Sequence, residues 1–324
     1  MRVILIGGTG HIGSYLVPKL VREGHEVVCI SRQAGKPFRE NPAWQSVEHV
    51  KIDRTEAEKT GNFGKSIKEL RGEIVIDLIC FTPDSAKLMV DALSGEVKQF
   101  IHCGTMWVHG HSERVPTRES QERKPFGAYG LGKAAIESEL LKAHQQEGFP
   151  VTILHPGHIT GPGRMPRSPA GNLNPDIFVK LALGQEVALP NLGLETVHHV
   201  HVDDVAQSFI RAIESPENAI GESFHVVSEQ ALTLRGYAIG VAEWYGQEAH
   251  LIYQSWGVWK KGMSLKDSEL TWDHIAHSPN GSIQKAKELL KYRPVYSSLQ
   301  AVREAIDHFA INENVRVLKI TKEQ

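Results

Sequence analysis

Tyr129 and Lys133 are the residues whose types and spacing point most directly to chemistry. They are four positions apart, so a helix would place both side chains on one face, about 6 Å apart along its axis. A free phenol has a pKa of about 10, too high for a base at neutral pH, and a neighbouring ammonium favours the phenolate. The pair could then take a proton from a substrate hydroxyl while a hydride leaves the carbon. Taken alone, this spacing is also common in solvated pairs.

A glycine-rich turn, GGTGHIG at residues 7–13, connects an apolar run at 3–6 to a segment with helical periodicity at 12–21. In such a turn the first glycine allows the tight bend, the second lets the backbone approach a pyrophosphate, and the third lets the helix pack on the strand. The helix N-terminus then favours negative charge. We predict a dinucleotide site here; the alternative is a tight turn without a ligand. The predicted contacts are Gly7, Thr9, Gly10, His11, Ile12 and Gly13.

Ser31 and Arg32 follow the second apolar run, where an NAD-selective site usually carries an acidic residue for the ribose hydroxyls. A hydroxyl and a guanidinium suit a 2′-phosphate, through charge-assisted hydrogen bonds. The sequence therefore favours NADP over NAD. The alternative is that Arg32 is a solvated surface charge that stacks on adenine.

A polar segment follows the apolar run at 99–103 and contains Thr105, Trp107 and His109. If this run is a parallel strand, Thr105 lies at the ligand crevice and can bind the reacting oxygen. Trp107 and His109 are predicted to contact the substrate, together with His158 from a later loop. Ordinary turn and loop residues are the alternative for this threonine and for both histidines.

The elements that must position these residues alternate between two periodicities over the first 155 residues. Alternating strands and helices predict an α/β fold, a Rossmann-like doubly wound parallel sheet. Expected strands lie at 3–6, 26–30, 47–52, 74–79, 99–103 and 151–155, and expected helices at 12–21, 63–70, 86–93 and 133–146.

The remainder of the chain begins with a proline-rich loop at 156–175, and loops of this length are usually functional. We predict a dinucleotide-binding domain at 1–160 with 196–227 returning to it, and a smaller substrate-binding lobe from 161–195 and 228–324. Further strands are expected at 197–202 and 223–227, and helices at 177–183, 204–213, 236–245 and twice within 283–309.

The composition is that of an ordinary globular protein, with 324 residues, 41% hydrophobic, 23% charged and a formal net charge of −2. This balance makes nucleic-acid binding through bulk charge improbable. No apolar run has the roughly 20 residues of a membrane helix, and three separated cysteines indicate reduced thiols in a cytoplasmic protein. His198, His199 and His201 form a tempting cluster, but a strand would turn His198 away from the other two. No metal site is predicted.

Together these motifs resemble the extended short-chain dehydrogenase/reductase family, its NAD-dependent epimerase/dehydratase group. The family pattern is a glycine turn, a Ser or Thr after the fifth strand and a Tyr-x-x-x-Lys pair, all present here in that order. The resemblance implies that Tyr129 is the acid/base, that Lys133 lowers its pKa and binds ribose, and that Thr105 orients the substrate. It also implies cofactor contacts from Asp53, Arg54, Ile79, Cys80, Phe81, Pro156 and His158, a substrate contact from Asn172, and a homodimer through the helix at 133–146.

Three departures from the family pattern affect the expected substrate. Gly132 replaces the usual Ser beside the Lys, and His109 stands where many epimerases have Tyr. Val197 stands where nucleotide-sugar epimerases usually carry an Arg that grips the pyrophosphate, so a nucleotide sugar is in doubt. The segment 74–84 is closer to a branch similar to chloroplast stem-loop-binding proteins, which bind RNA on this fold.

The function predicted is an NAD(P)-dependent oxidoreductase or epimerase that transfers a hydride to or from a sugar-like or other hydroxyl/carbonyl small molecule. Reduction, dehydrogenation, epimerisation and dehydration share this hydride step, so the motifs do not separate them. The alternative is a nucleotide-sensing or RNA-binding protein that kept the fold and lost the chemistry.

Overall fold

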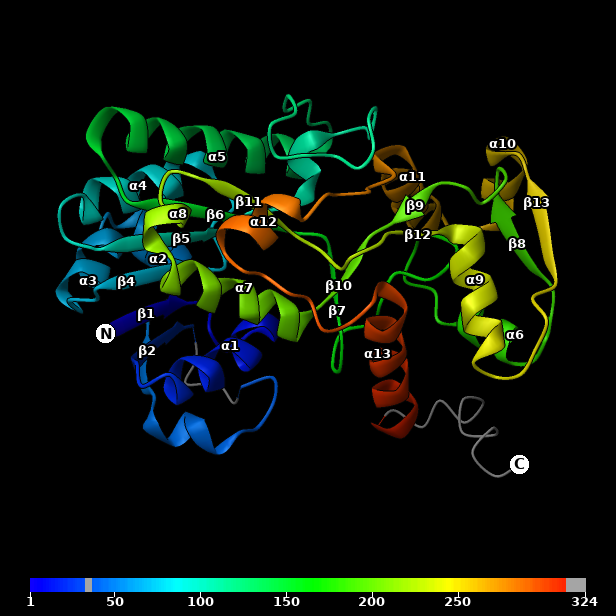
Figure 1. The fold of residues 1–324 in the computed structure, drawn as a ribbon, viewed down its shortest axis with the longest axis horizontal. Helices are drawn as coiled ribbons and strands as arrows, with labels where there is room; N and C mark the ends of the chain where they lie inside the picture. The colour runs from blue at the N-terminus through cyan, green and yellow to red at the C-terminus, as the bar shows by residue number, and fades with distance from the viewer. Residues whose placement is uncertain (33–36, 313–324) are drawn as a thin grey trace.

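A seven-stranded parallel sheet forms the centre of the computed structural model, which describes residues 1–32 and 37–312 (Figure 1). The strand order is β11-β6-β5-β4-β1-β2-β3. The order reverses between β1 and β4, and a ligand crevice is expected outside the carboxyl ends of these strands. This confirms the predicted doubly wound α/β fold. The strands are β1 Arg2–Ile6, β2 Glu26–Ser31, β3 Glu48–Lys51, β4 Ile74–Asp77, β5 Gln99–Cys103, β6 Val151–Pro156 and β11 Ser223–Val226.

Helices bury both faces of the sheet, as a parallel sheet requires. Along β1, Val3 and Leu5 belong to one hydrophobic core, whereas Ile4 and Ile6 belong to the other. Figure 1 shows α4 and α5 above the sheet and α1 and α7 below it. These flanking helices are α1 His11–Arg22, α3 Phe63–Glu69, α4 Pro83–Leu93, α5 Gly127–Glu147 and α7 Val202–Glu214, with the short α2 Arg54–Lys59 and α8 Pro216–Ala219.

A third hydrophobic core lies beyond the sheet, on the right in Figure 1. Phe178 and Tyr237 lie at its centre, with ring centroids 6.2 Å apart. Two short parallel strands and two helices in this region escaped the sequence analysis: β8 Val187–Pro190, β13 Leu251–Gln254, α10 Trp256–Trp259 and α11 Leu265–His277. The helices α6 Asp176–Ala182 and α9 Leu234–Glu243 lie close to their predicted positions.

The expected strand at 197–202 is divided in the structure. β9 Thr196–Val197 pairs with β12 Leu232–Thr233, whereas β10 His199–His201 pairs with β7 His158–Thr160. Helix α7 begins at Val202 because His201 caps it: its Nδ1 accepts a hydrogen bond of 3.1 Å from the Asp203 N–H.

The C-terminal part of the chain returns to the main sheet and to β10. Helix α12 Gln284–Leu289 packs against β11, and α13 Ser298–Asn312 packs against β10. The buried Asp204 carboxylate fixes the connecting segment by accepting from the backbone N–H groups of Val295 and Tyr296. In the described residues, the fold also contains the 3-10 helices η1 Pro42–Ser46, η2 Met106–His109 and η3 Lys260–Gly262. Within the described residues, none of the helices has the length and apolar character needed to cross a bilayer.

Several histidines are buried in the core. Desolvation by burial lowers the pKa of His198 and His274 to about 4 and that of His199 to about 3. His102, in the middle of β5, is fully buried, and neither of its ring nitrogens has a hydrogen-bond partner. Each of these imidazole rings stays uncharged in the folded protein at a pH where the same histidine in the unfolded chain is already protonated.

We therefore expect steep acid destabilisation. Unfolded histidines gain protons as pH falls below about 6.5 and the buried ones do not, so each contributes a loss of about 1.4 kcal/mol per pH unit in the free energy of unfolding. Urea denaturation from about pH 7 down to about pH 5 measures the slope.

His102→Leu is the matched variant, because it removes two unpartnered polar atoms from the core. It should raise the free energy of unfolding by about 1–3 kcal/mol and weaken the pH dependence by one proton. A variant less stable than the wild type at every pH would contradict this interpretation of the buried histidines.

Candidate active site

A cavity of ≈ 680 Å³ lies at the carboxyl ends of the central strands and contains most of the predicted reacting groups. Its sheet side includes Thr105 after β5 and both Tyr129 and Lys133 from the first turns of α5. The opposite side comes from the loop after β7 and from α11. The predicted site residues that line this cavity are Ile12, Phe81, Thr105, Trp107, Tyr129, Lys133, Pro156 and His158.

Lys133 is held firmly at the bottom of this site. Its ammonium donates to the carbonyl oxygens of Cys80 and Cys103, at 2.8 and 2.9 Å, and the residue is only 4% exposed. Burial lowers the pKa of Lys133. The two carbonyls follow β4 and end β5, so this one side chain links both strand ends to α5.

Tyr129 lies one helical turn before Lys133 and presents its ring to the cavity, with 51% of the residue exposed. Surrounding protein atoms still desolvate the phenol and raise its pKa, while a hydrogen bond with the Thr105 side chain opposes the rise. The expected lowering of this pKa by Lys133 is therefore not seen in this structure, where carbonyl groups hold the ammonium.

Thr105 is positioned by a buried polar network that the sequence analysis missed. Its backbone N–H donates to Nδ1 of His155 at 2.9 Å, and Nε2 of His155 lies 3.0 Å from a carboxylate oxygen of Glu137. Arg123 donates to both oxygens of that carboxylate, at 2.8 and 3.0 Å. Because Nδ1 of His155 accepts, its proton is on Nε2 and points to Glu137.

Glu137 is buried on α5, two turns after Tyr129. Burial alone would raise the pKa of its carboxyl, but the contacts with His155 and Arg123 hold that pKa well below its ordinary range. The carboxylate therefore stays charged and anchors His155, which in turn fixes the backbone at Thr105.

The glycine turn has the geometry that a pyrophosphate needs. Gly7 has a φ of +83°, and a Cβ on Gly13 would lie 1.9 Å from the carbonyl oxygen of Gly8, so no side chain fits there. Helix α1 has no side-chain cap and no acidic residue in its first turn, which leaves its N–H groups available to an anion. These features fit a dinucleotide at this turn.

Other predicted contacts around the turn have identifiable positions. The carbonyl of Thr9 accepts from the Phe38 N–H, and His11 lies 3.1 Å from the carbonyl oxygen of Pro162. Ile79 packs against Gly7. Ser31 ends β2, and the exposed Arg32 follows it.

Asp53 and Arg54 have structural contacts. The Asp53 side chain caps α2. Arg54 is buried and donates to both oxygens of Asp77 at 2.8 Å and to Glu58 at 2.6 Å. Its Nη1 and Nε are thus directed to Asp77 and Glu58, whereas its Nη2 is buried without a hydrogen-bond partner.

Two predicted substrate residues lie outside the cavity. His109 is buried, with Nε2 2.7 Å from Nε2 of His225. Asn172 is also buried and donates to the Thr271 hydroxyl, so it fixes the loop before α6 to α11. In the described part of the chain, no three His, Cys, Asp or Glu side chains are grouped as metal ligands.

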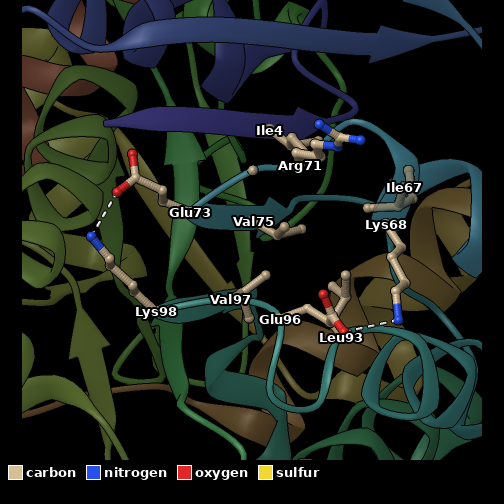
Figure 2. Close-up of a pocket in the computed structure, with 11 residues that line it drawn as sticks. Ile4, Ile67, Lys68, Arg71, Glu73, Val75, Leu93, Glu96, Val97 and Lys98 are labelled. Carbon is tan, nitrogen blue, oxygen red and sulfur yellow. Dashed lines mark hydrogen bonds and ion pairs between the residues drawn. The ribbon is translucent and has the colours of Figure 1, made fainter.

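A smaller cavity of ≈ 190 Å³ lies at the other end of the sheet, where the central strands begin (Figure 2). Four of its charged residues form two ion pairs, Lys68 with Glu96 at 2.9 Å and Lys98 with Glu73 at 2.7 Å, and Arg71 also lines it. It faces the amino ends of β4 and β5, away from Tyr129. This cavity lacks the reactive groups of the larger one.

The family assignment follows from comparison with known sequences. The model of the NAD dependent epimerase/dehydratase family matches residues 3–226. The chain belongs to this family. The match confirms the resemblance inferred from the sequence and supports an NAD-dependent activity of the epimerase/dehydratase type.

Relatives within the family have diverse names. The chain is 25% identical over 323 residues to the chloroplast stem-loop binding protein of 41 kDa b of Arabidopsis thaliana, covering 94% of this chain and 78% of the relative. It is 27% identical over 230 residues to a UDP-glucose 4-epimerase of Mycolicibacterium smegmatis, covering 65% and 73%.

Two solved structures show the same fold as this chain. A UDP-glucose 4-epimerase from Thermotoga maritima with UDP-glucose superposes with a TM-score of 0.73 at 21% identity, covering 97% of this chain and all of that one. A UDP-glucuronic acid 4-epimerase from Bacillus cereus in complex with NAD gives 0.69 at 18% identity, covering 96% and 99%.

The buried network behind Thr105 yields a stability prediction. Glu137→Gln should lower the free energy of unfolding by about 1.5–3 kcal/mol, because the partly buried Arg123 loses its charged hydrogen-bond partner. The pKa of Glu137 is depressed in the folded state, so this loss should be full above about pH 4.5 and shrink as pH falls below it.

Urea denaturation at several pH values measures this loss. Glu147→Gln, at the exposed end of the same helix, is the control and should change little. Equal stability of the two variants at neutral pH would show that the network does not support the fold.

Proposed function

We propose that this chain is an NAD(P)-dependent enzyme of the oxidoreductase/epimerase type that transfers a hydride to or from a hydroxyl or carbonyl carbon of a small molecule. The observation that carries the proposal is that Thr105, Tyr129 and Lys133 line one cavity. This cavity lies at the carboxyl ends of the strands, where the glycine turn also lies. A bound nicotinamide cofactor supplies the hydride acceptor or donor.

In this proposal the protein supplies proton transfer and orientation. Tyr129 exchanges a proton with the substrate oxygen, and the Thr105 hydroxyl hydrogen-bonds that oxygen and the phenol. Lys133, bound to two carbonyls, places a positive charge one helical turn from the phenol and retains a donor for a ribose hydroxyl. Trp107 and His158 shape the substrate side of the cavity.

The substrate-binding lobe is proposed to comprise 161–195 and 228–324, because residues from both segments form the third core and the far wall of the cavity. Several relatives and solved structures are named for sugar nucleotides, which supports a sugar-like substrate. Val197 is fully buried and offers no charge to a substrate pyrophosphate.

NADP is the proposed cofactor, with NAD as the alternative. The support is local: Arg32 is exposed immediately after β2, beside the glycine turn, and no acidic residue takes the place expected for NAD.

RNA binding is the second candidate, and the relative named for stem-loop binding favours it. A protein that kept only the fold would not need Tyr129 and Lys133 together in one cavity, whereas an enzyme does. The net charge of −2 also gives no general attraction for nucleic acid.

Tyr129→Phe tests the proposed chemistry. Loss of the phenolic proton should reduce kcat by about 10²–10⁴-fold, with little change in cofactor affinity. Turnover is followed by nicotinamide absorbance on whichever member of a panel of sugar nucleotides, sugars and hydroxy acids reacts with the wild type. Tyr253→Phe, exposed on β13, is the control; full turnover by Tyr129→Phe refutes the mechanism.

Arg32→Ala tests the cofactor preference. Removal of one charge-assisted hydrogen bond should weaken NADP binding by roughly 10–100-fold and leave NAD binding unchanged. Calorimetry on the purified protein gives both affinities, with Arg22→Ala, exposed at the end of α1, as the control. Tighter binding of NAD than of NADP by the wild type would refute the preference.

The cofactor released on denaturing the purified protein separates the reaction types. A tightly retained nicotinamide cofactor favours an epimerase, which returns its hydride to the same substrate. A protein that releases none favours a dehydrogenase or reductase, which exchanges cofactor at each turnover.

A further inference from the structure

Two arginines from the loop after β7, Arg164 and Arg167, face the active-site cavity without a carboxylate partner. In the part of the chain that the structure describes, neither guanidinium lies within ion-pairing distance of an acidic side chain. The hydrogen bond of the Arg167 side chain goes from Nε to Nε2 of His274 at 2.8 Å, an uncharged acceptor. The cavity therefore carries two arginine charges that no described carboxylate pairs with directly.

Asp273 is the acidic residue among the described side chains that line the cavity, and its carboxylate contacts residues other than these arginines. One of its oxygens accepts from Nε1 of Trp107 at 3.1 Å, and the other lies 3.5 Å from Nδ1 of His277. Burial and the charge of Arg164 lower the pKa of Arg167 to about 10, although Asp273 acts in the opposite direction. Positive charge is thus costly at this position, and a bound anion would remove that cost.

A tight turn fixes the backbone of Arg164, and the side chain is exposed. Its N–H donates to the carbonyl of Gly161 at 3.1 Å, and its own carbonyl accepts from the Thr160 hydroxyl. Its charge also acts on the phenol of Tyr129, where it opposes the rise in pKa. Arg164, Arg167 and the proposed proton-transfer group Tyr129 therefore line the same cavity.

His158 contributes a neutral donor to the same wall. Its Nδ1 accepts from the His198 N–H at 3.2 Å, so the proton is on Nε2, which is buried and has no partner. Burial keeps the pKa of His158 well below its ordinary value, so the ring remains neutral at physiological pH. An anionic oxygen would satisfy this donor together with the guanidinium groups.

We propose that Arg164, Arg167 and His158 bind an acidic group of the substrate, a carboxylate or a phosphate, next to the carbon on which Tyr129 acts. This proposal rests on the proposed function and narrows it: the substrate is an acid, and the acidic group lies on its reacting end. Neutral sugars and simple alcohols would leave both guanidinium groups and the imidazole donor unpaired.

Calorimetric titration of the NADP-saturated protein tests the proposal, because the bound cofactor occupies the phosphate site at the glycine turn. The probes are glycolate, its neutral isostere glycolamide, and inorganic phosphate. We expect glycolate or phosphate to bind at least tenfold more tightly than glycolamide, and the preferred ion to distinguish a carboxylate from a phosphate.

Arg164→Gln is the decisive variant, because the exposed side chain has no partner within the protein that folding would require. It should weaken binding of the preferred ion by at least tenfold, and Arg167→Lys should weaken it less because the charge remains. Arg235→Gln, on the lobe beside Tyr253 and outside the cavity, is the control and should bind the ion as the wild type does.

The proposal is overturned if glycolamide binds as tightly as glycolate and phosphate, if neither ion binds, or if Arg164→Gln binds the ion as well as the wild type. Failure of the proposed chemistry is distinguishable from this. If Tyr129→Phe keeps full turnover while Arg164→Gln loses ion binding, the mechanism is wrong and the anion site stands. If Tyr129→Phe loses turnover while Arg164→Gln binds normally, only the anion site is wrong.

Discussion

The hydrogen bonds from the Lys133 ammonium to the carbonyls of Cys80 and Cys103 are the constraint on which the site depends. A charged group that is 4% exposed is tolerated only where it is well hydrogen-bonded, and these two carbonyls provide that at the ends of two adjacent strands. Because Lys133 is hydrogen-bonded to the sheet, the rotation of α5 about its axis and its position along the strands are fixed relative to the sheet. That in turn determines where Tyr129, one turn earlier, presents its phenol.

A second set of polar contacts supports the same region from behind. Arg123, Glu137 and His155 form a buried series that ends on the backbone N–H of Thr105. Thr105 is thereby fixed from the main chain, and its hydroxyl accepts from the Trp107 N–H at 3.4 Å and also hydrogen-bonds the phenol of Tyr129. Imidazole suits the middle position because it accepts at one nitrogen and donates at the other. The site is therefore held by hydrogen bonds whose donors and acceptors are each satisfied.

The sheet and the position of Tyr129 and Lys133 on one helix face were predictable from the sequence because both depend on local patterns. Apolar runs such as Val3–Ile6 are buried on both faces, and the glycine turn and Tyr-x-x-x-Lys spacing are each contained in one turn or helix. The lobe was less predictable: β13 is partly exposed along its length, and α11 carries few apolar residues, so neither has a clear periodicity.

The polar network was not predictable, because its members are brought together only by the fold. Arg123 reaches Glu137 across 14 positions, and His155 reaches Thr105 across 50. His109 illustrates the opposite case, in which a residue placed at the site by the sequence lies outside the cavity. It follows the correct strand, but the 3-10 helix η2 turns its ring inward against His225 instead of toward the cavity. Short helices of this kind leave little trace in the sequence.

Titration of the Tyr129 phenol by ultraviolet difference spectroscopy, with Tyr129→Phe as the reference, tests the central claim most directly. The account predicts that the phenol of the protein alone ionises above the ordinary value of 10.0, because its surroundings desolvate it. Addition of oxidised nicotinamide cofactor should lower that pKa toward neutrality, because positive charge then lies beside the phenol. A phenol that ionises at the same pH with and without the cofactor would contradict its assignment as the proton acceptor.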